Sequence, residues 1–196
     1  MNDDYNLLRN HIGRFVKLTD AEWSMLEPHL QTRKIKRHGF FAREGVQARE
    51  IGYVIKGDMR HYYTREGEEK TTYFYFENSL VASYISCLTG TPSQLTIQAL
   101  TDVKMVVFPY AIVRELYAKS HAWERFGRLL AEYLAIGLEE RMVGLLTQSP
   151  EERYIQLLNS NKRKIPERIA QHYIANYLGI TPVSLSRIRN RVLKQM

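Results

Sequence analysis

The spacing of apolar residues changes twice along this 196-residue chain. Up to about residue 30, and again after Pro109, apolar residues recur with the period of a helix. Between these parts lie short β-branched or aromatic runs separated by turn residues, at 51–55, 59–64, 70–76, 95–100 and 103–108. Closely spaced short strands are typical of an antiparallel barrel or jelly roll. The sequence therefore predicts an α+β protein with one contiguous antiparallel β-roll between helices.

Local signals predict several helix ends and turns. Residues 3–30 are predicted to be helical, with Thr19 and Glu22 forming a capping box at the start of a short helix. The segment 59–76 has Gly67 at its middle and predicts a hairpin, because glycine accepts the backbone angles of a tight turn.

The longest uninterrupted helical pattern covers residues 121–148. Ser149 and Pro150 follow it as N-cap and first residue of a new helix, which makes this the best domain boundary. The long helix carries a wide apolar stripe that can pack on the roll but favours a two-fold dimer interface. The stripe consists of Phe126, Leu129, Leu130, Tyr133, Leu134, Gly137, Leu138, Met142, Leu145 and Leu146.

The positive charge of the chain is concentrated near its end. Residues 150–196 contain nine Lys or Arg and three Asp or Glu, whereas residues 1–149 contain nineteen and eighteen. A basic segment on a nearly neutral body is typical of nucleic-acid binding. A solvated basic surface has the same charge, so the charge alone leaves both interpretations open.

Composition excludes several classes of protein. Cys87 is the only cysteine, which excludes an intramolecular disulfide, a cysteine-rich zinc site and an iron–sulfur cluster. The six histidines have no metal-ligand spacing, so we expect no metal site. No apolar run approaches the ~20 residues of a membrane span, and the polar N-terminus is unlike a signal peptide. We therefore expect a cytoplasmic protein.

Residues 171–192 carry the most specific pattern, which is helix, tight turn, helix. Ala175 is small where two helices would cross, and Gly179 stands at the turn, where a positive φ is needed. Thr181 and Pro182 are the expected N-cap and first residue of the second helix. The pattern predicts a helix-turn-helix that binds duplex DNA, and the alternative is an ordinary helical hairpin with a basic surface.

The second helix of this pair has two distinct faces. Leu185, Ile188 and Val192 are predicted to pack inward. On the opposite face an arginine could bond guanine O6 and N7, whereas Val183 could touch only a thymine methyl group or a sugar. Side chains on the flanks would meet phosphates. The candidate DNA-binding residues are Thr181, Val183, Ser184, Ser186, Arg187, Arg189, Asn190, Arg191 and Lys194.

With these residues the chain resembles the Crp/Fnr family of bacterial transcription regulators over nearly its whole length. The stretch 178–189 (LGITPVSLSRIR) is the most specific part of this resemblance. The family's Ser-Arg pair in the recognition helix falls on Ser186 and Arg187. Val183 stands where the family often has a glutamate that reads a cytosine, so the base read there is open.

The resemblance implies that three segments of the chain have separate functions. Residues 1–120 would form a cyclic-nucleotide-binding-like sensor, 121–148 a dimerisation helix and 149–196 the DNA-binding helix-turn-helix. It implies a non-enzymatic homodimer that binds a palindromic operator, with RNA polymerase as a further partner. The sensor would take an unidentified small-molecule effector, and the sequence assigns no cofactor.

The predicted roll departs from the family in its phosphate-binding cassette. Nucleotide-binding members have Gly-Glu at its start and an Arg followed by a small residue later. Ala82-Ser83 and Ser93-Gln94 stand in those places here, and residues 71–103 contain no Lys or Arg. A buried phosphate would then depend on backbone N–H groups alone. We therefore expect weak or absent binding of cyclic AMP.

The predicted roll is also dense in aromatic residues, about half of which would face inward. They can form the core of the roll or line an apolar ligand pocket. The candidate pocket residues are Tyr62, Phe74, Phe76, Ser83, Tyr84, Ser93, Gln94 and Thr96.

The second departure from the family is at the C-terminus. Only residues 193–196 follow Val192, where members usually continue into a two-stranded wing. We expect no full wing, which leaves Lys162, Arg163 and Lys164 as candidate phosphate contacts.

Two other functions stay open at this point. A ligand-binding or interaction module that has lost DNA binding would fit a chain without a wing. A cupin-like enzyme would fit the roll, although the His/Glu cluster that such enzymes need is missing from the sequence.

Overall fold

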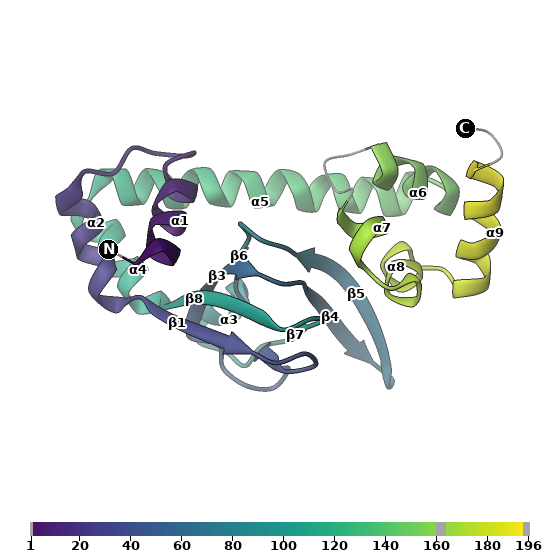
Figure 1. Cartoon of the computed structure of the whole chain (residues 1–196), viewed down its shortest axis with the longest axis horizontal. Coiled ribbons are helices and arrows are strands. Elements are labelled where there is room, and N and C mark those ends of the chain that lie inside the picture. Colours follow the sequence, from purple (N-terminus) through teal and green to yellow (C-terminus); the bar gives the residue numbers. More distant parts are fainter. Residues whose placement is uncertain (1, 160–163, 194–196) are drawn as a thin grey trace. The chain divides into compact units, whose positions relative to one another are not determined.

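The computed structural model describes residues 2–159 and 164–193 (Figure 1). Along the chain, helices precede and follow a block of strands, as the spacing of apolar residues predicts. In chain order the elements are α1 (Asp3–Ile12), α2 (Asp20–Leu26), the 3₁₀ helix η1 (Glu27–His29), β1 (Gln31–Ile35), β2 (Phe40–Ala42), β3 (Glu50–Lys56), β4 (Met59–Arg65), β5 (Glu68–Tyr75), β6 (Leu80–Val81), α3 (Tyr84–Thr89), β7 (Thr96–Ala99), β8 (Val103–Pro109), α4 (Tyr110–Lys119), α5 (His121–Thr147), α6 (Pro150–Asn159), α7 (Lys164–Arg168), α8 (Gln171–Leu178) and α9 (Pro182–Leu193).

The chain forms two compact units. The roll unit consists of Met1–His61 and Phe74–Leu134, and the C-terminal unit consists of Tyr62–Tyr73 and Ala135–Met196. The division passes through β4, β5 and α5. The tip of the β4–β5 hairpin therefore belongs with the C-terminal helices.

The strands form two four-stranded sheets, in the orders β1-β8-β3-β6 and β2-β7-β4-β5. In the first sheet β8 pairs antiparallel with both β1 and β3, so that Val106 lies opposite Thr32 on one side and Tyr53 on the other. The β4–β5 hairpin turns through Glu66 (φ 54°) and Gly67 (φ 80°), and two consecutive positive φ angles match the right-handed twist of a tight hairpin. These pairings confirm the predicted α+β class, the antiparallel roll and the hairpin around Gly67.

The core of the roll lies between the two sheets. Because side chains alternate along a strand, β8 contributes to this core with every second residue. The first sheet supplies Val54, Val81, Val103, Met105 and Val107, and the second supplies Met59, Tyr75, Ile97 and Ala99. All nine side chains are buried.

The other residues of β8 face a second core. Val106 and Phe108 pack there with side chains from α1, α2, α4 and the first part of α5. Trp23 of α2 is the largest of the fully buried side chains. The helices of the roll unit therefore cover the outer face of the first sheet.

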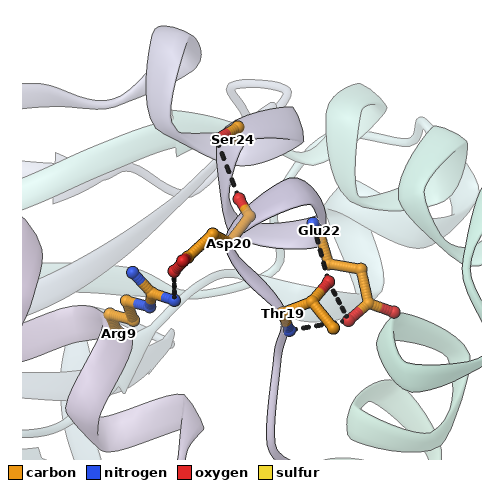
Figure 2. Close-up of polar contacts among 5 residues, drawn as sticks. All are labelled: Arg9, Thr19, Asp20, Glu22 and Ser24. Carbon is orange, nitrogen blue, oxygen red and sulfur yellow. Dashed lines mark hydrogen bonds and ion pairs between the residues drawn. The ribbon is translucent and has the colours of Figure 1, made fainter.

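Figure 2 shows the predicted capping box at the start of α2. The backbone N–H of Glu22 donates to Thr19 Oγ1 at 3.2 Å, and the backbone N–H of Thr19 donates to Glu22 Oε2 at 2.8 Å. The other carboxylate oxygen of Glu22 accepts from Ser120 Oγ at 2.7 Å. These hydrogen bonds lower the pKa of Glu22, with Ser120 making the largest contribution. The cap also joins α2 to the start of α5.

The structure corrects two details of the sequence prediction. Residues 13–19 are not helical, because the chain leaves α1 at the C-cap Gly13 and re-enters a helix only at Thr19. The strands β1, β2 and β6 were not predicted. The last two have three and two residues, and β1 exposes most of its side chains, so none of them shows a period-2 pattern.

Candidate nucleic-acid interface

Helices α8 and α9 form the predicted helix-turn-helix within the C-terminal unit. Gly179 follows α8 with φ 73° and ψ 30°, the left-handed conformation predicted for it. The N–H of Ile180 donates to the carbonyl of Ala175, and the N–H of Gly179 donates to that of Asn176, each at 3.0 Å. This pair of hydrogen bonds ends α8 and sets the direction in which the chain enters α9.

The side chains between α8 and α9 are fully buried. Ala175 has no exposed surface and Leu178 is 1% exposed. From α9, Leu185, Ile188 and Val192 are buried against them, as the helical period predicts. The tight packing around Ala175 fixes which face of α9 is turned outward.

The start of α9 has the predicted cap. The N–H of Ser184 donates to Thr181 Oγ1 at 3.2 Å, and Pro182 is the first helical residue. The Thr181 and Ser184 hydroxyl groups also lie 3.0 Å apart and share a hydrogen bond. Both candidate residues therefore shape the N-terminus of α9, where backbone N–H groups attract a phosphate.

The outward face of α9 is free to meet a partner. Val183, Ser186, Arg187 and Asn190 are exposed. Within the described part of the chain, Arg187 has no hydrogen-bond or ion-pair partner. An exposed guanidinium on a small-residue face can reach bases without losing an existing contact.

The two arginines on the flanks of α9 are placed differently. Arg191 donates through Nε and Nη2 to Glu151 Oε2 of α6, at 2.9 and 2.5 Å. Arg189 is half-buried and lines a groove of about 570 Å³ with residues of α6, α7 and α8, among them Tyr154 and Ile174. Neither side chain points freely outward in the way that Arg187 does.

Four basic candidates remain. Lys164 is half-buried at the start of α7. Lys162, Arg163 and Lys194 lie outside the described residues.

Two half-buried arginines hold the C-terminal end of α8. Arg153 of α6 donates through Nη2 to the carbonyl of Leu178 at 2.9 Å and through Nη1 to the carbonyl of Gln148 at 2.5 Å. Arg141 of α5 donates to the carbonyl of Tyr177 and stacks 3.8 Å from the centre of its ring. Burial lowers the pKa of Arg141. Positive charge at a helix C-terminus stabilises the unpaired carbonyl groups there.

Asn176 of α8 joins the helix-turn-helix to the β4–β5 hairpin inside the same unit. Its Oδ1 accepts from the N–H of Thr71 at 2.6 Å, and its Nδ2 donates to the carbonyl of Glu69 at 2.7 Å. Strand β5 is at the edge of its sheet, so the amide takes the place of a neighbouring strand. Sequence reasoning missed Asn176, Arg141 and Arg153, because their partners lie far away in the sequence or are backbone atoms.

The candidate pocket residues of the roll differ in how far they are buried. Ser83, Ser93 and Thr96 are buried, as are Tyr62 and Phe74. Phe76 is half-buried, whereas Gln94 is exposed and Tyr84, 39% exposed, packs edge-on against Tyr110. Ser83 and Ser93 are in direct contact with each other.

This serine pair occupies the place of the expected nucleotide cassette. Ser93 Oγ donates to the carbonyl of Leu95 at 2.7 Å. Ser83 Oγ lies 2.8 Å from Ser93 Oγ and must be the donor there, since Ser93 has already used its only proton. Neither hydroxyl has a proton left for a phosphate.

The buried basic side chains His61 and Arg60 do not replace the phosphate-binding arginine that the expected cassette lacks. Burial lowers the pKa of His61 to about 4, so this ring is neutral at physiological pH. Arg60 donates through Nε and Nη2 to Gln98 Oε1, at 3.0 and 2.7 Å. It follows Met59 along β4 and so points away from the core between the sheets.

No group of three or more His, Cys, Asp or Glu side chains is arranged to hold a metal ion in the part of the chain that the structure describes. No helix within those residues is long and apolar enough to cross a membrane.

Comparison with known proteins agrees with this architecture. Residues 32–120 match the cyclic nucleotide-binding domain family. The fumarate and nitrate reduction regulatory protein of Vibrio cholerae is 24% identical over 190 residues, which cover 90% of this chain and 75% of that protein.

Two solved structures are similar in fold. FixK2 from Bradyrhizobium japonicum has a TM-score of 0.68 and 18% identity, and the match covers 85% of each chain. A transcriptional regulator of the Crp/Fnr family from Eubacterium rectale has a TM-score of 0.70 and 19% identity, covering 91% of this chain and 85% of that one. Residues 32–120 therefore belong to the cyclic nucleotide-binding domain family, and with a roll, a long connecting helix and a helix-turn-helix in this order the chain is similar to transcription regulators of the Crp/Fnr family.

Proposed function

We propose that the protein is a homodimeric, sequence-specific DNA-binding regulator whose helix α9 enters the major groove of a palindromic operator. The exposed face of α9 carries this proposal, since Arg187 stands unpaired among the described residues and opposite the buried Leu185. Arginine bonds guanine O6 and N7 bidentately, which is the commonest specific contact in the major groove. Such a regulator would work in the cytoplasm, with RNA polymerase as a further partner.

The exposed surface of α5 supports a dimer. Every residue from 131 to 140 is exposed, although most of them are apolar. Large apolar side chains continue this surface towards the end of the helix, with Leu138 70% and Leu146 78% exposed. Monomeric proteins rarely expose so much contiguous apolar surface. A second copy packed along α5 would cover it and would place two α9 helices about one DNA turn (~34 Å) apart.

The same helix offers a route for a signal. It runs without interruption from the roll unit into the C-terminal unit. An effector that binds one alignment of the two α5 helices better than another would shift the population of DNA-binding dimers.

Selection of genomic DNA tests the proposal directly. Purified protein is incubated with sheared DNA of its source genome, with and without cyclic AMP, and the retained DNA is sequenced. We expect one palindromic site to be enriched in both conditions. Enrichment of no site in either condition would favour a ligand-binding module that does not read DNA. Enrichment only with cyclic AMP would preserve DNA binding and contradict the argument from the serine pair.

Substitution of Arg187 by alanine should reduce the preference for the operator over random DNA. The loss of one bidentate base contact is expected to cost about 1–3 kcal/mol of discrimination. Arg191→Ala is the matched comparison on the same helix. It should weaken binding to all sequences alike and lower the salt slope by at most about one, because Arg191 must first leave Glu151. Operator titrations at several salt concentrations separate the two effects, and an unchanged preference for Arg187→Ala would place recognition elsewhere.

Cyclic AMP should have no measurable effect on the stability of the protein. A nucleotide with a dissociation constant of about 10 μM would stabilise the folded state by about 2.7 kcal/mol at 1 mM. We expect no such shift, since the hydroxyl protons of Ser83 and Ser93 are already used within the protein. Thermal unfolding with and without 1 mM nucleotide measures this, and a rise of several degrees would show that the cassette is functional.

A further inference from the structure

The first turn of α9 exposes an apolar side chain that the fold does not use. Val183 is 61% exposed. It is the only large apolar side chain that is exposed among the described residues after α5. Its neighbours in this turn, Pro182 and Ser184, belong to the helix cap. Val183 is therefore accessible to a binding partner of α9.

Val183 and Arg187 are neighbours on the helix surface. Residues four apart on an α-helix lie next to each other on one face, so these two side chains would reach adjacent base pairs. Ser186 lies beside them and is also exposed. The three side chains form a short row that ends at the N-terminus of α9.

The chemistry of valine limits what it can read. The side chain has neither a hydrogen-bond donor nor an acceptor, and its β-branch makes it short and stiff. In the major groove the distinctive apolar group is the methyl group at C5 of thymine. Cytosine offers an N4 donor at its edge, and valine cannot accept that hydrogen bond.

We propose that Val183 reads a pyrimidine 5-methyl group, so that each half-site of the operator has a thymine beside the base pair contacted by Arg187. The inference rests on the DNA-binding function proposed above. It also predicts that 5-methylcytosine can replace this thymine better than unmodified cytosine, because both pyrimidines carry the same methyl group at the same place in the groove.

The test uses the full-length protein and the operator obtained by genomic selection. Each thymine is replaced in turn by deoxyuridine, which removes the methyl group and leaves every hydrogen-bonding group unchanged. Dissociation constants are measured for the wild type and for Val183→Ala. The side chain is exposed, so the variant should fold, and a thermal unfolding curve checks this.

We expect one thymine per half-site at which deoxyuridine weakens the wild type roughly 3–5-fold, the effect of one buried methyl group. Val183→Ala should bind both DNAs with nearly equal affinity at this position. The remaining thymines are internal controls, at which both proteins should respond alike. At the sensitive position, 5-methylcytosine should bind the wild type more tightly than cytosine by a similar factor.

A different result would overturn the assignment. If a site is enriched but no thymine distinguishes the wild type from Val183→Ala, the reading of a methyl group is wrong while DNA binding stands. If no site is enriched at all, both the proposed function and this inference fail.

Discussion

Replacing Leu138 and Leu145 together by aspartate should convert the protein into a monomer and abolish tight operator binding. The two leucines are seven residues apart on α5 and so lie on one face of the helix, 70% and 46% exposed. A two-fold interface would bury four of them at about 1.5–3 kcal/mol each. The expected loss of at least ~6 kcal/mol weakens the dimer more than about 10⁴-fold, and buried aspartates would weaken it further.

Sedimentation and operator titration at the same salt concentration measure the two consequences. A monomer can contact only one half-site, so operator affinity should fall at least about 100-fold. Glu139→Gln with Glu140→Gln is the control, because it changes the charge of the same helical turn by two units while leaving the leucines intact. A double aspartate variant that is still dimeric at wild-type concentrations would show that another surface forms the dimer.

Leu185→Ala should have the largest effect on the stability of the C-terminal unit. The side chain has no exposed surface and lies between α8 and α9. Removing a buried leucine side chain costs about 2–5 kcal/mol, which is a large share of the stability of a small helical unit. We expect α8 and α9 to lose their protection against hydrogen exchange and operator binding to be lost with it.

The roll unit should retain its own protection, since it has a separate core. Hydrogen exchange of peptides from β3 and from α9 distinguishes local unfolding of α8 and α9 from unfolding of the whole protein. Val183→Ala, on the same helix but exposed, should change stability by less than about 0.5 kcal/mol. Equal protection of α9 in the wild type and in Leu185→Ala would contradict the packing described here.

The helix-turn-helix could be predicted because its signals are local. The positive φ of Gly179, the cap by Thr181 and the buried face of α9 each depend on residues within a few positions of one another. The capping box at Thr19 and the N-cap at Ser149 were predictable for the same reason. Short-range hydrogen bonding and helical period are sufficient to identify such features.

The rest of the structure depends on contacts between distant residues. Strand β1 presents Thr32, Arg33 and Lys34 to its surroundings and becomes a strand only because β8 provides a partner seventy residues later. The amide of Asn176 finds its partners in β5, more than a hundred residues earlier. Tyr84 likewise packs on Tyr110 rather than in the roll. No local pattern predicts these distant contacts, because the sequence does not show whether a polar side chain is hydrated or hydrogen-bonded to another part of the protein.

If the proposed effector and operator both bind, the contact between Asn176 and β5 links their affinities. Strand β5 begins in the C-terminal unit, where it contacts α8, and ends in the roll unit, so one strand is shared by the two units. Any effector whose affinity depends on the position of β5 is thereby linked to the position of α8. Thermodynamic linkage then requires that operator DNA change effector affinity by the same factor by which the effector changes DNA affinity. Binding of operator DNA would thus change the affinity of the roll unit for its effector, and with it the effector concentration needed for half-maximal occupancy.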